Sequence, residues 1–124
     1  MKLLEEYLLR EREEFAKKKT RLLHSGRIDR IPTSLSRLLS EIGEETKDAS
    51  AFTLNLAVDY GGKDEVVRAV NTCRSSGVLT EETIRNHLAH PKLPDIDLVI
   101  RTSGEMRTSN FFLWQTAYAE WFFP

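Results

Sequence analysis

The chain has 124 residues, with 18 lysines and arginines against 19 aspartates and glutamates and a formal net charge of -1. This balance excludes a broadly basic protein that holds nucleic acid by bulk electrostatic attraction, although it allows a local cluster of cations. No apolar run approaches the ~20 residues of a membrane-spanning helix, and the acidic start of the chain is unlike a secretory signal. The single cysteine, Cys73, excludes an internal disulfide framework and a cysteine zinc cage.

The first half of the chain predicts two helices and two strands in alternation. Residues 1–19 carry apolar side chains near one helical face, and residues 21–26 form a short apolar segment that ends at a glycine. A second helix follows Pro32, and its buried stripe is formed by Leu35, Leu38, Leu39 and Ile42. Residues 52–58 alternate between apolar and polar side chains, which is the period of a strand.

The second half continues the alternation. After a pair of glycines, apolar residues at helical spacing predict a third helix with Cys73 on its inner face as a small core residue. Thr80 and the two glutamates after it are typical of the cap and acidic first turn of a fourth helix. Residues 97–100 predict a strand that is buried on both faces, residues 110–118 predict another helix, and residues 121–123 form a short apolar end.

Helices and strands therefore alternate along the whole chain. Such alternation is typical of α/β proteins, so we expect a mostly parallel sheet flanked by helices. No internal repeat, low-complexity tract or linker interrupts the pattern, and we expect residues 1–124 to form a single domain.

The segment most suited to binding a ligand is the polar loop of residues 101–110. It begins where the predicted strand ends, and parallel sheets bind their ligands beyond the carboxyl ends of the strands. The loop gathers two arginines, Arg101 and Arg107, with several hydroxyl side chains that include Ser109. Guanidinium groups fit phosphate oxygens as planar forks, and the N-terminus of a following helix would add N–H donors. This pattern indicates a diphosphate site.

A plainer interpretation of the same loop stays open. Arg101 could pair with Glu105, and Ser109 could cap the following helix without any ligand. A weaker candidate site lies at residues 59–62, where paired glycines follow a strand and either admit a ligand or simply make a tight turn.

A longer segment adds specificity, because it closely resembles the C-terminal signature of the cis-prenyltransferases: residues 97–120, which read DLVIRTSGEMRTSNFFLWQTAYAE. Undecaprenyl diphosphate synthase is the bacterial type member of that family. The family's earlier strand-and-glycine motif is similar to residues 54–62, and the segment after its edge-side strand is similar to residues 26–32. The order and spacing match across essentially the whole chain. The resemblance implies a partial undecaprenyl diphosphate synthase-like fold over residues 1–124.

The resemblance also implies a prenyltransferase of isoprenoid biosynthesis, which joins isopentenyl diphosphate to an allylic diphosphate repeatedly and makes a cis-polyprenyl diphosphate. Arg101, Arg107 and Ser109 match the residues that hold the diphosphate of isopentenyl diphosphate. Glu120 matches a carboxylate involved in binding the magnesium ion. The family further implies a cytoplasmic dimer that binds no nucleic acid and whose lipid product brings peripheral contact with a membrane.

Two parts that the family carries near its N-terminus have no match in this sequence. One is the Asp-Gly-Asn-Gly-Arg-Trp loop, which cradles the allylic diphosphate and supplies an essential aspartate, so no catalytic residue is assigned. The other is the Asn-Trp-x-Arg-Pro segment. Asp59 also stands where the family commonly has Asn, and we expect its carboxylate to repel a diphosphate mildly.

Three hypotheses follow from the resemblance and its departures. The first is a truncated or split cis-prenyltransferase that is inactive alone and needs a second copy or a complementary N-terminal chain. The second is a non-catalytic partner subunit that supplies the anion donors to such a chain. The third is only a fragment that binds isopentenyl diphosphate. In each case we expect the isolated chain to expose apolar strand edges, and therefore either to dissolve poorly or to pair with something that covers those edges.

Overall fold

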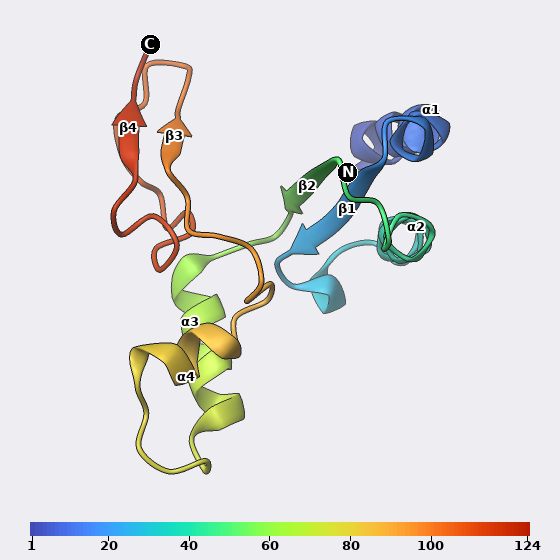
Figure 1. Cartoon of the computed structure of the whole chain (residues 1–124). Coiled ribbons are helices and arrows are strands. Elements are labelled where there is room, and N and C mark those ends of the chain that lie inside the picture. Colours follow the sequence, from blue (N-terminus) through green and yellow to red (C-terminus); the bar gives the residue numbers. More distant parts are fainter. The chain divides into compact units, whose positions relative to one another are not determined.

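The computed structural model describes all 124 residues, which form two compact units, Met1–Asp59 and Tyr60–Pro124 (Figure 1). Each unit contains two α-helices and one pair of parallel strands. The chain is therefore an α/β protein with parallel strands, as the alternating pattern predicts. The single domain expected over residues 1–124 stays a prediction.

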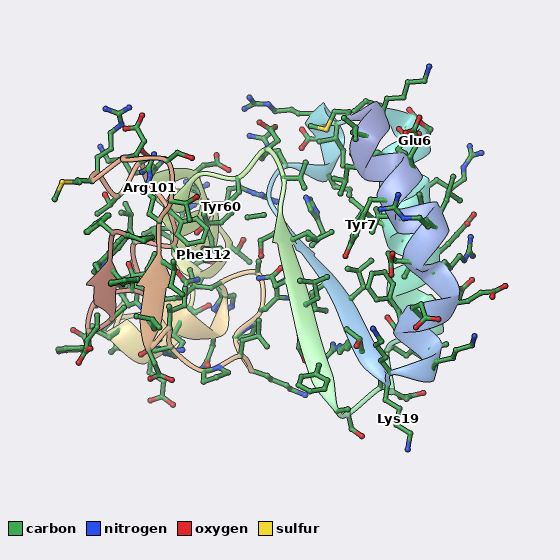
Figure 2. The ribbon with its side chains drawn as sticks, turned by 90° about the horizontal axis from the view of Figure 1, so that it is seen from above. Glu6, Tyr7, Lys19, Tyr60, Arg101 and Phe112 are labelled. Carbon is green, nitrogen blue, oxygen red and sulfur yellow. The ribbon has the colours of Figure 1, made fainter.

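The first unit alternates helices and strands in the predicted order: α1 (Lys2–Lys17), β1 (Thr20–Ser25), a 3₁₀ turn η1 (Ile28–Arg30), α2 (Thr33–Glu45) and β2 (Phe52–Ala57). β1 and β2 pair in parallel with Leu22 opposite Leu54. Both α-helices lie on the same side of this strand pair (Figure 2).

The core of the first unit lies between the two helices and the strands. Leu8 of α1, Leu22 of β1, and Leu35 and Ile42 of α2 are almost completely buried. Burial of each such side chain contributes ~1.5–3 kcal/mol, so this cluster holds the helices on the sheet. The predicted stripe of α2 is confirmed, because Leu38 and Leu39 are buried beside the other two.

An ion pair also connects α1 and α2 at the surface. Arg12 Nε of α1 donates to Glu45 Oε2 of α2 at 3.0 Å. The hydrogen bond from Arg12 lowers the pKa of the Glu45 carboxyl, and the carboxylate in turn raises the pKa of Arg12. Both side chains are in contact with solvent, Arg12 partly and Glu45 more fully, so solvent screens this attraction and the apolar core contributes most of the stability.

The end of β1 meets the end of β2 through a glycine. Gly26 has a φ of +130°, and a Cβ built on it would collide with the backbone carbonyl oxygen of Val58. Arg27 N donates to Asp59 O at 2.9 Å across the same junction. The Asp59 carboxylate pairs with Arg30 Nε at 2.9 Å, so its negative charge is compensated inside this unit.

The second unit contains α3 (Gly62–Cys73), α4 (Glu81–Asn86), β3 (Leu98–Ile100) and β4 (Glu120–Phe122). The predicted inner face of α3 is confirmed, since Ala69 and Cys73 are buried. The predicted cap of α4 is also confirmed, because Thr80 Oγ1 accepts a hydrogen bond from Thr83 N at 3.1 Å.

The helix predicted near the end of the chain is wrong, and one strand there was not predicted. Residues 110–118 form turns in place of a helix, because Asn110 and Phe112 have φ values of 63° and 43°, in the left-handed region. A single helical turn survives where Thr116 N donates to Phe112 O at 2.9 Å. The apolar end at residues 121–123 is largely a strand, since β4 pairs in parallel with β3 and places Trp121 opposite Val99.

The strand at residues 97–100 is present but is not buried on both faces. Val99 is buried, whereas Leu98 and Ile100 are 53% and 59% exposed. The cause is the size of the sheet, because β3 has β4 as its only strand neighbour (Figure 1). None of the α-helices combines the length and the hydrophobicity that a membrane-spanning segment requires.

Candidate functional site

The loop that follows β3 folds back on its first residue. Arg101 stands at the carboxyl end of β3, where its N–H donates to Phe122 O of β4 at 3.0 Å. Its guanidinium Nη1 donates to Ser109 Oγ at 2.8 Å and also to the backbone carbonyl oxygen of Arg107. Two of the three predicted site residues, eight positions apart in the chain, therefore meet at one point.

The guanidinium of Arg107 makes a different contact. Its Nη2 pairs with Glu105 Oε2 at 2.7 Å, and the Arg107 side chain is largely exposed while that of Glu105 is about half-exposed. The alternative in which Arg101 pairs with Glu105 is therefore wrong in this structure. The alternative in which Ser109 caps a helix is also wrong, because turns follow Ser109. The expected helix N-terminus does not contribute N–H donors to the loop.

A pocket of about 310 Å³ opens beside Arg101. Its polar wall is formed by Arg101, Thr108 and Ser109, and its apolar wall by Val99, Ile100, Phe111 and Trp121. A polar wall that carries a cation suits an anionic group, and the apolar wall beside it suits a short hydrocarbon. The pocket can therefore accept an amphiphilic anion.

Residues 60–62 of the weaker candidate segment meet the loop of residues 101–110 inside the second unit, where α3 begins. Gly62 N donates to Asn110 O at 2.8 Å, and Lys63 N donates to Asn110 Oδ1 at 2.9 Å. A Cβ on Gly62 would lie 2.9 Å from Leu113 Cγ and 3.0 Å from Asn110 O. The paired glycines thus allow close backbone approach between the start of α3 and the loop of residues 101–110.

A buried carboxylate in the first turn of α3 connects three further segments of the second unit. Glu65 of α3 is 8% exposed, and its oxygens accept hydrogen bonds from Tyr60 Oη at 2.6 Å, Gln115 Nε2 at 3.0 Å and Ala89 N at 3.1 Å. The ring of Tyr60 stacks on Phe112, with centroids 4.3 Å apart (Figure 2). Burial, followed by the hydrogen bond to Glu65, raises the pKa of Tyr60 far above its usual range.

Glu120, the expected magnesium ligand, lies away from the arginines. It is the first residue of β4 and stands opposite Leu98, whereas Arg101 follows the other end of β3. The structure contains no group of three or more His, Cys, Asp or Glu side chains that could hold a metal ion. Since magnesium usually takes one or two carboxylates with phosphate oxygens and water, Glu120 fits one ligand position and the residues here do not complete a site.

Sequence reasoning missed several residues of this region. Thr108 and Trp121 line the pocket, and Asn110 and Glu65 organise the loop behind it. A signal for Asn110 was present, because Asn is enriched at positive φ and follows a polar loop. Glu65 gave no local signal, since its partners are distant in sequence and it sits in the first turns of a helix, where acidic residues are common.

Comparison with known sequences connects these features to one family. A sequence model of the family described as "Putative undecaprenyl diphosphate synthase" matches residues 1–124. The chain is similar to the isoprenyl transferase of Fusobacterium nucleatum subsp. nucleatum, with 46% identity over 122 residues that cover 97% of this chain and 53% of that protein. It is 42% identical over 129 residues to the isoprenyl transferase of Thermotoga maritima, covering 99% of this chain and 55% of that protein.

Solved structures give the same result. The chain matches a probable undecaprenyl diphosphate synthase from Campylobacter jejuni with a TM-score of 0.92 and 35% identity, covering 99% of this chain and 59% of that chain. It matches lavandulyl diphosphate synthase from Lavandula x intermedia, solved with dimethylallyl diphosphate, with a TM-score of 0.87 and 30% identity, covering 97% and 56%. The chain spans about half the length of the curated relatives it matches.

Proposed function

Because the chain belongs to the undecaprenyl diphosphate synthase family of cis-prenyltransferases, we propose that it binds isopentenyl diphosphate for cis-prenyl chain elongation. The observation that carries the proposal is the contact between Arg101 and Ser109 beside a half-apolar pocket. The polar wall suits the diphosphate, and the apolar wall suits the five-carbon chain.

Three side chains are proposed to bind the diphosphate: Arg101, Arg107 and Ser109. Arg101 and Ser109 already lie together, and Arg107 reaches the anion once its exposed pair with Glu105 opens. Such a pair costs little to open, because solvent-exposed ion pairs contribute only ~0–1 kcal/mol. A guanidinium that turns from a carboxylate to a diphosphate exchanges one charged partner for a stronger one.

The proposed reaction is an electrophilic condensation. The double bond of isopentenyl diphosphate attacks the allylic carbon, the allylic diphosphate leaves with the electrons of its carbon–oxygen bond, and a proton is lost. The residues of this chain would hold and orient one reactant while their positive charge compensates its phosphates. The groups that receive the allylic diphosphate are proposed to come from a second chain. Support for an allylic substrate class comes from the lavandulyl diphosphate synthase, which was solved with dimethylallyl diphosphate.

That second chain is proposed to be a complementary N-terminal chain, and a second copy of this chain is proposed as a dimer partner. Glu120 is proposed to add one carboxylate to a magnesium ion whose other ligands lie on that chain or on the substrate. We further propose a cytoplasmic location, with peripheral membrane contact through the lipid product. A non-catalytic partner subunit is the second candidate function, in which this chain supplies the paired Arg101 and Ser109 to a complementary chain.

A prenyl-transfer assay tests the function. It contains radiolabelled isopentenyl diphosphate, farnesyl diphosphate and magnesium, and it is run with and without an added N-terminal fragment of a family member. We expect labelled polyprenyl product only when the fragment is present. Product from this chain alone would contradict the expected dependence on a second chain. Absence of product in both arms, together with retained binding of isopentenyl diphosphate, would favour the role of a binding fragment.

Arg101→Lys tests the site itself. Lysine keeps the charge but loses the fork that contacts Ser109 Oγ, so we expect the affinity for isopentenyl diphosphate to fall roughly tenfold. Arg74→Lys is the matched control, because Arg74 is exposed at the end of α3 and outside the pocket. Equal loss of affinity in both variants would contradict the assignment of the diphosphate to Arg101.

A further inference from the structure

We propose that Asn110 is the positioning residue of the diphosphate site, because it fastens the loop that carries Ser109 to the first turn of α3. The inference rests on the proposed function, since it assigns a task to a residue beside the same site. Asn110 itself is exposed and lies outside the lining of the pocket. Its effect on a ligand therefore passes through the neighbouring residues.

The first argument is the pair of hydrogen bonds that Asn110 accepts. Its side-chain Oδ1 accepts from Lys63 N at 2.9 Å, and its backbone O accepts from Gly62 N at 2.8 Å. The N-cap residue of α3 is Gly61, which has no side chain to satisfy these donors. One residue 47 positions further along the chain thus occupies two of the free N–H groups at the start of the helix.

The second argument is the fit between this residue type and its backbone. Asn110 has a φ of 63°, in the left-handed region that Asn tolerates better than most residues. The opposite surface consists of glycines, and a Cβ on Gly61 would lie 3.0 Å from Asn110 Nδ2. Asn110 and the paired glycines are therefore complementary in both conformation and space, and this complementarity fixes the distance between the loop and the helix.

The third argument is the position of Ser109 in the chain. Ser109 directly precedes Asn110 and also has a left-handed φ, of 50°. On one side its Oγ accepts from Arg101 Nη1, and on the other its backbone continues into the residue fixed on α3. Downstream, Phe112 is stacked on Tyr60. Ser109 therefore lies between its contact with Arg101 and the contact of Asn110 with α3. If the hydrogen bonds of Asn110 were lost, the Ser109 hydroxyl would move more freely relative to Arg101.

A helix cap elsewhere in the same unit supplies a matched control. Thr80 caps α4 through one hydrogen bond from Thr83 N, as Asn110 caps α3 through Lys63 N. Thr80 lies outside the loop of residues 101–110 and outside the lining of the pocket. Loss of either cap removes the same kind of interaction. A purely structural role for Asn110 therefore predicts equal consequences for Asn110→Ala and Thr80→Ala at the anion site.

The experiment combines two measurements on the full chain. Hydrogen exchange reports the order of residues 101–113, and calorimetric titration with inorganic pyrophosphate reports the anion site. We expect Asn110→Ala to speed exchange in residues 101–113 and to weaken pyrophosphate binding roughly tenfold. Thr80→Ala should leave both unchanged within about twofold. Asn110→Asp keeps the acceptor for Lys63 N and should restore slow exchange in the loop.

The outcomes separate the two proposals. Unchanged exchange and unchanged pyrophosphate affinity in Asn110→Ala would overturn the positioning role and leave the proposed function intact. Equal loss of affinity in Asn110→Ala and Thr80→Ala would also overturn it, because the effect would then be general destabilisation. If the unsubstituted chain binds no pyrophosphate, the proposed function fails, and with it the role of Asn110 in ligand binding.

Discussion

The hydroxyl of Tyr60 donates a 2.6 Å hydrogen bond to Oε1 of Glu65, so a phenol in the segment before α3 is paired with a buried carboxylate of α3. Burial is the main cause of the raised pKa of Tyr60, and the hydrogen bond and charge of Glu65 add to it. The neutral phenol is therefore the form that the folded chain stabilises. This pairing makes stability depend on pH in the alkaline range.

We expect stability to fall as the pH rises above ~10, the usual pKa of tyrosine. Above that pH the unfolded chain loses the phenolic proton while the folded chain keeps it, so the stabilisation is present below pH ~10 and is progressively lost above it. Thermal midpoints between pH 8 and 11 (roughly the range around the free pKa) measure the effect, and Tyr60→Phe should flatten the alkaline slope. Phenolate absorbance that rises for all three tyrosines together would contradict this prediction.

We expect even the conservative substitution Glu65→Gln to destabilise the fold. Glu65→Gln replaces one acceptor oxygen with an NH₂ group, which must then face one of three donors: Tyr60 Oη, Gln115 Nε2 or Ala89 N. We expect the free energy of unfolding to fall by about 1–3 kcal/mol, the cost of a buried unsatisfied group. Urea unfolding measures it. Glu13→Gln on the exposed side of α1 is the control and should change stability by less than about 0.5 kcal/mol.

Two glycines of the first unit should respond to alanine with opposite signs. Gly26→Ala adds a Cβ at positive φ that collides with Val58 O, so we expect a loss of about 3 kcal/mol or more. Gly43→Ala lies inside α2, where the new Cβ would meet Leu22 O at an ordinary 3.6 Å. It should stabilise the chain by ~0.5–1 kcal/mol, because alanine restricts the unfolded chain and favours a helix. Two variants that change stability in the same direction would refute this reasoning.

The exposed side chains of β3 should limit solubility. Leu98→Thr removes an apolar side chain that is 53% exposed, so we expect a higher saturating concentration and an unchanged thermal midpoint. Val99→Thr changes the buried neighbour, and it should lower the thermal midpoint because a hydroxyl replaces a methyl in the core. A chain that is already freely soluble and monomeric would argue against exposed strand edges as the reason for a partner.

Local periodicity predicted the elements whose structure is decided locally. The stripe of α2 is one example, since Leu35 and Ile42 are both buried on one face. The turn after Ser109 was mispredicted because the apolar run from Phe111 is compatible with a helix. Its backbone is instead set by Asn110, whose partner Lys63 is 47 residues away. The strand β4 was missed because three residues carry no period, and its pairing with β3 is likewise a long-range property.

The same division holds for the candidate site. The residue types of the loop indicated an anion site, and the structure brings Arg101 and Ser109 together. The sequence could not show that Arg107 would be turned toward Glu105, because that pair is decided by a loop with positive φ at Ser103 and Gly104. Nor could it show the separation of Glu120 from Arg101, which depends on the register of two strands.

The guanidinium of Arg101 is already occupied by Ser109 and by the carbonyl oxygen of Arg107 before any anion arrives. At the proposed site a diphosphate would therefore compete with the protein for the same donors, and its net gain would be the difference between two sets of hydrogen bonds. We expect such a site to discriminate by charge, because a neutral acceptor offers the guanidinium no more than the loop itself does. We therefore expect polyvalent anions to displace the internal contacts of Arg101, and weak neutral acceptors to leave them in place.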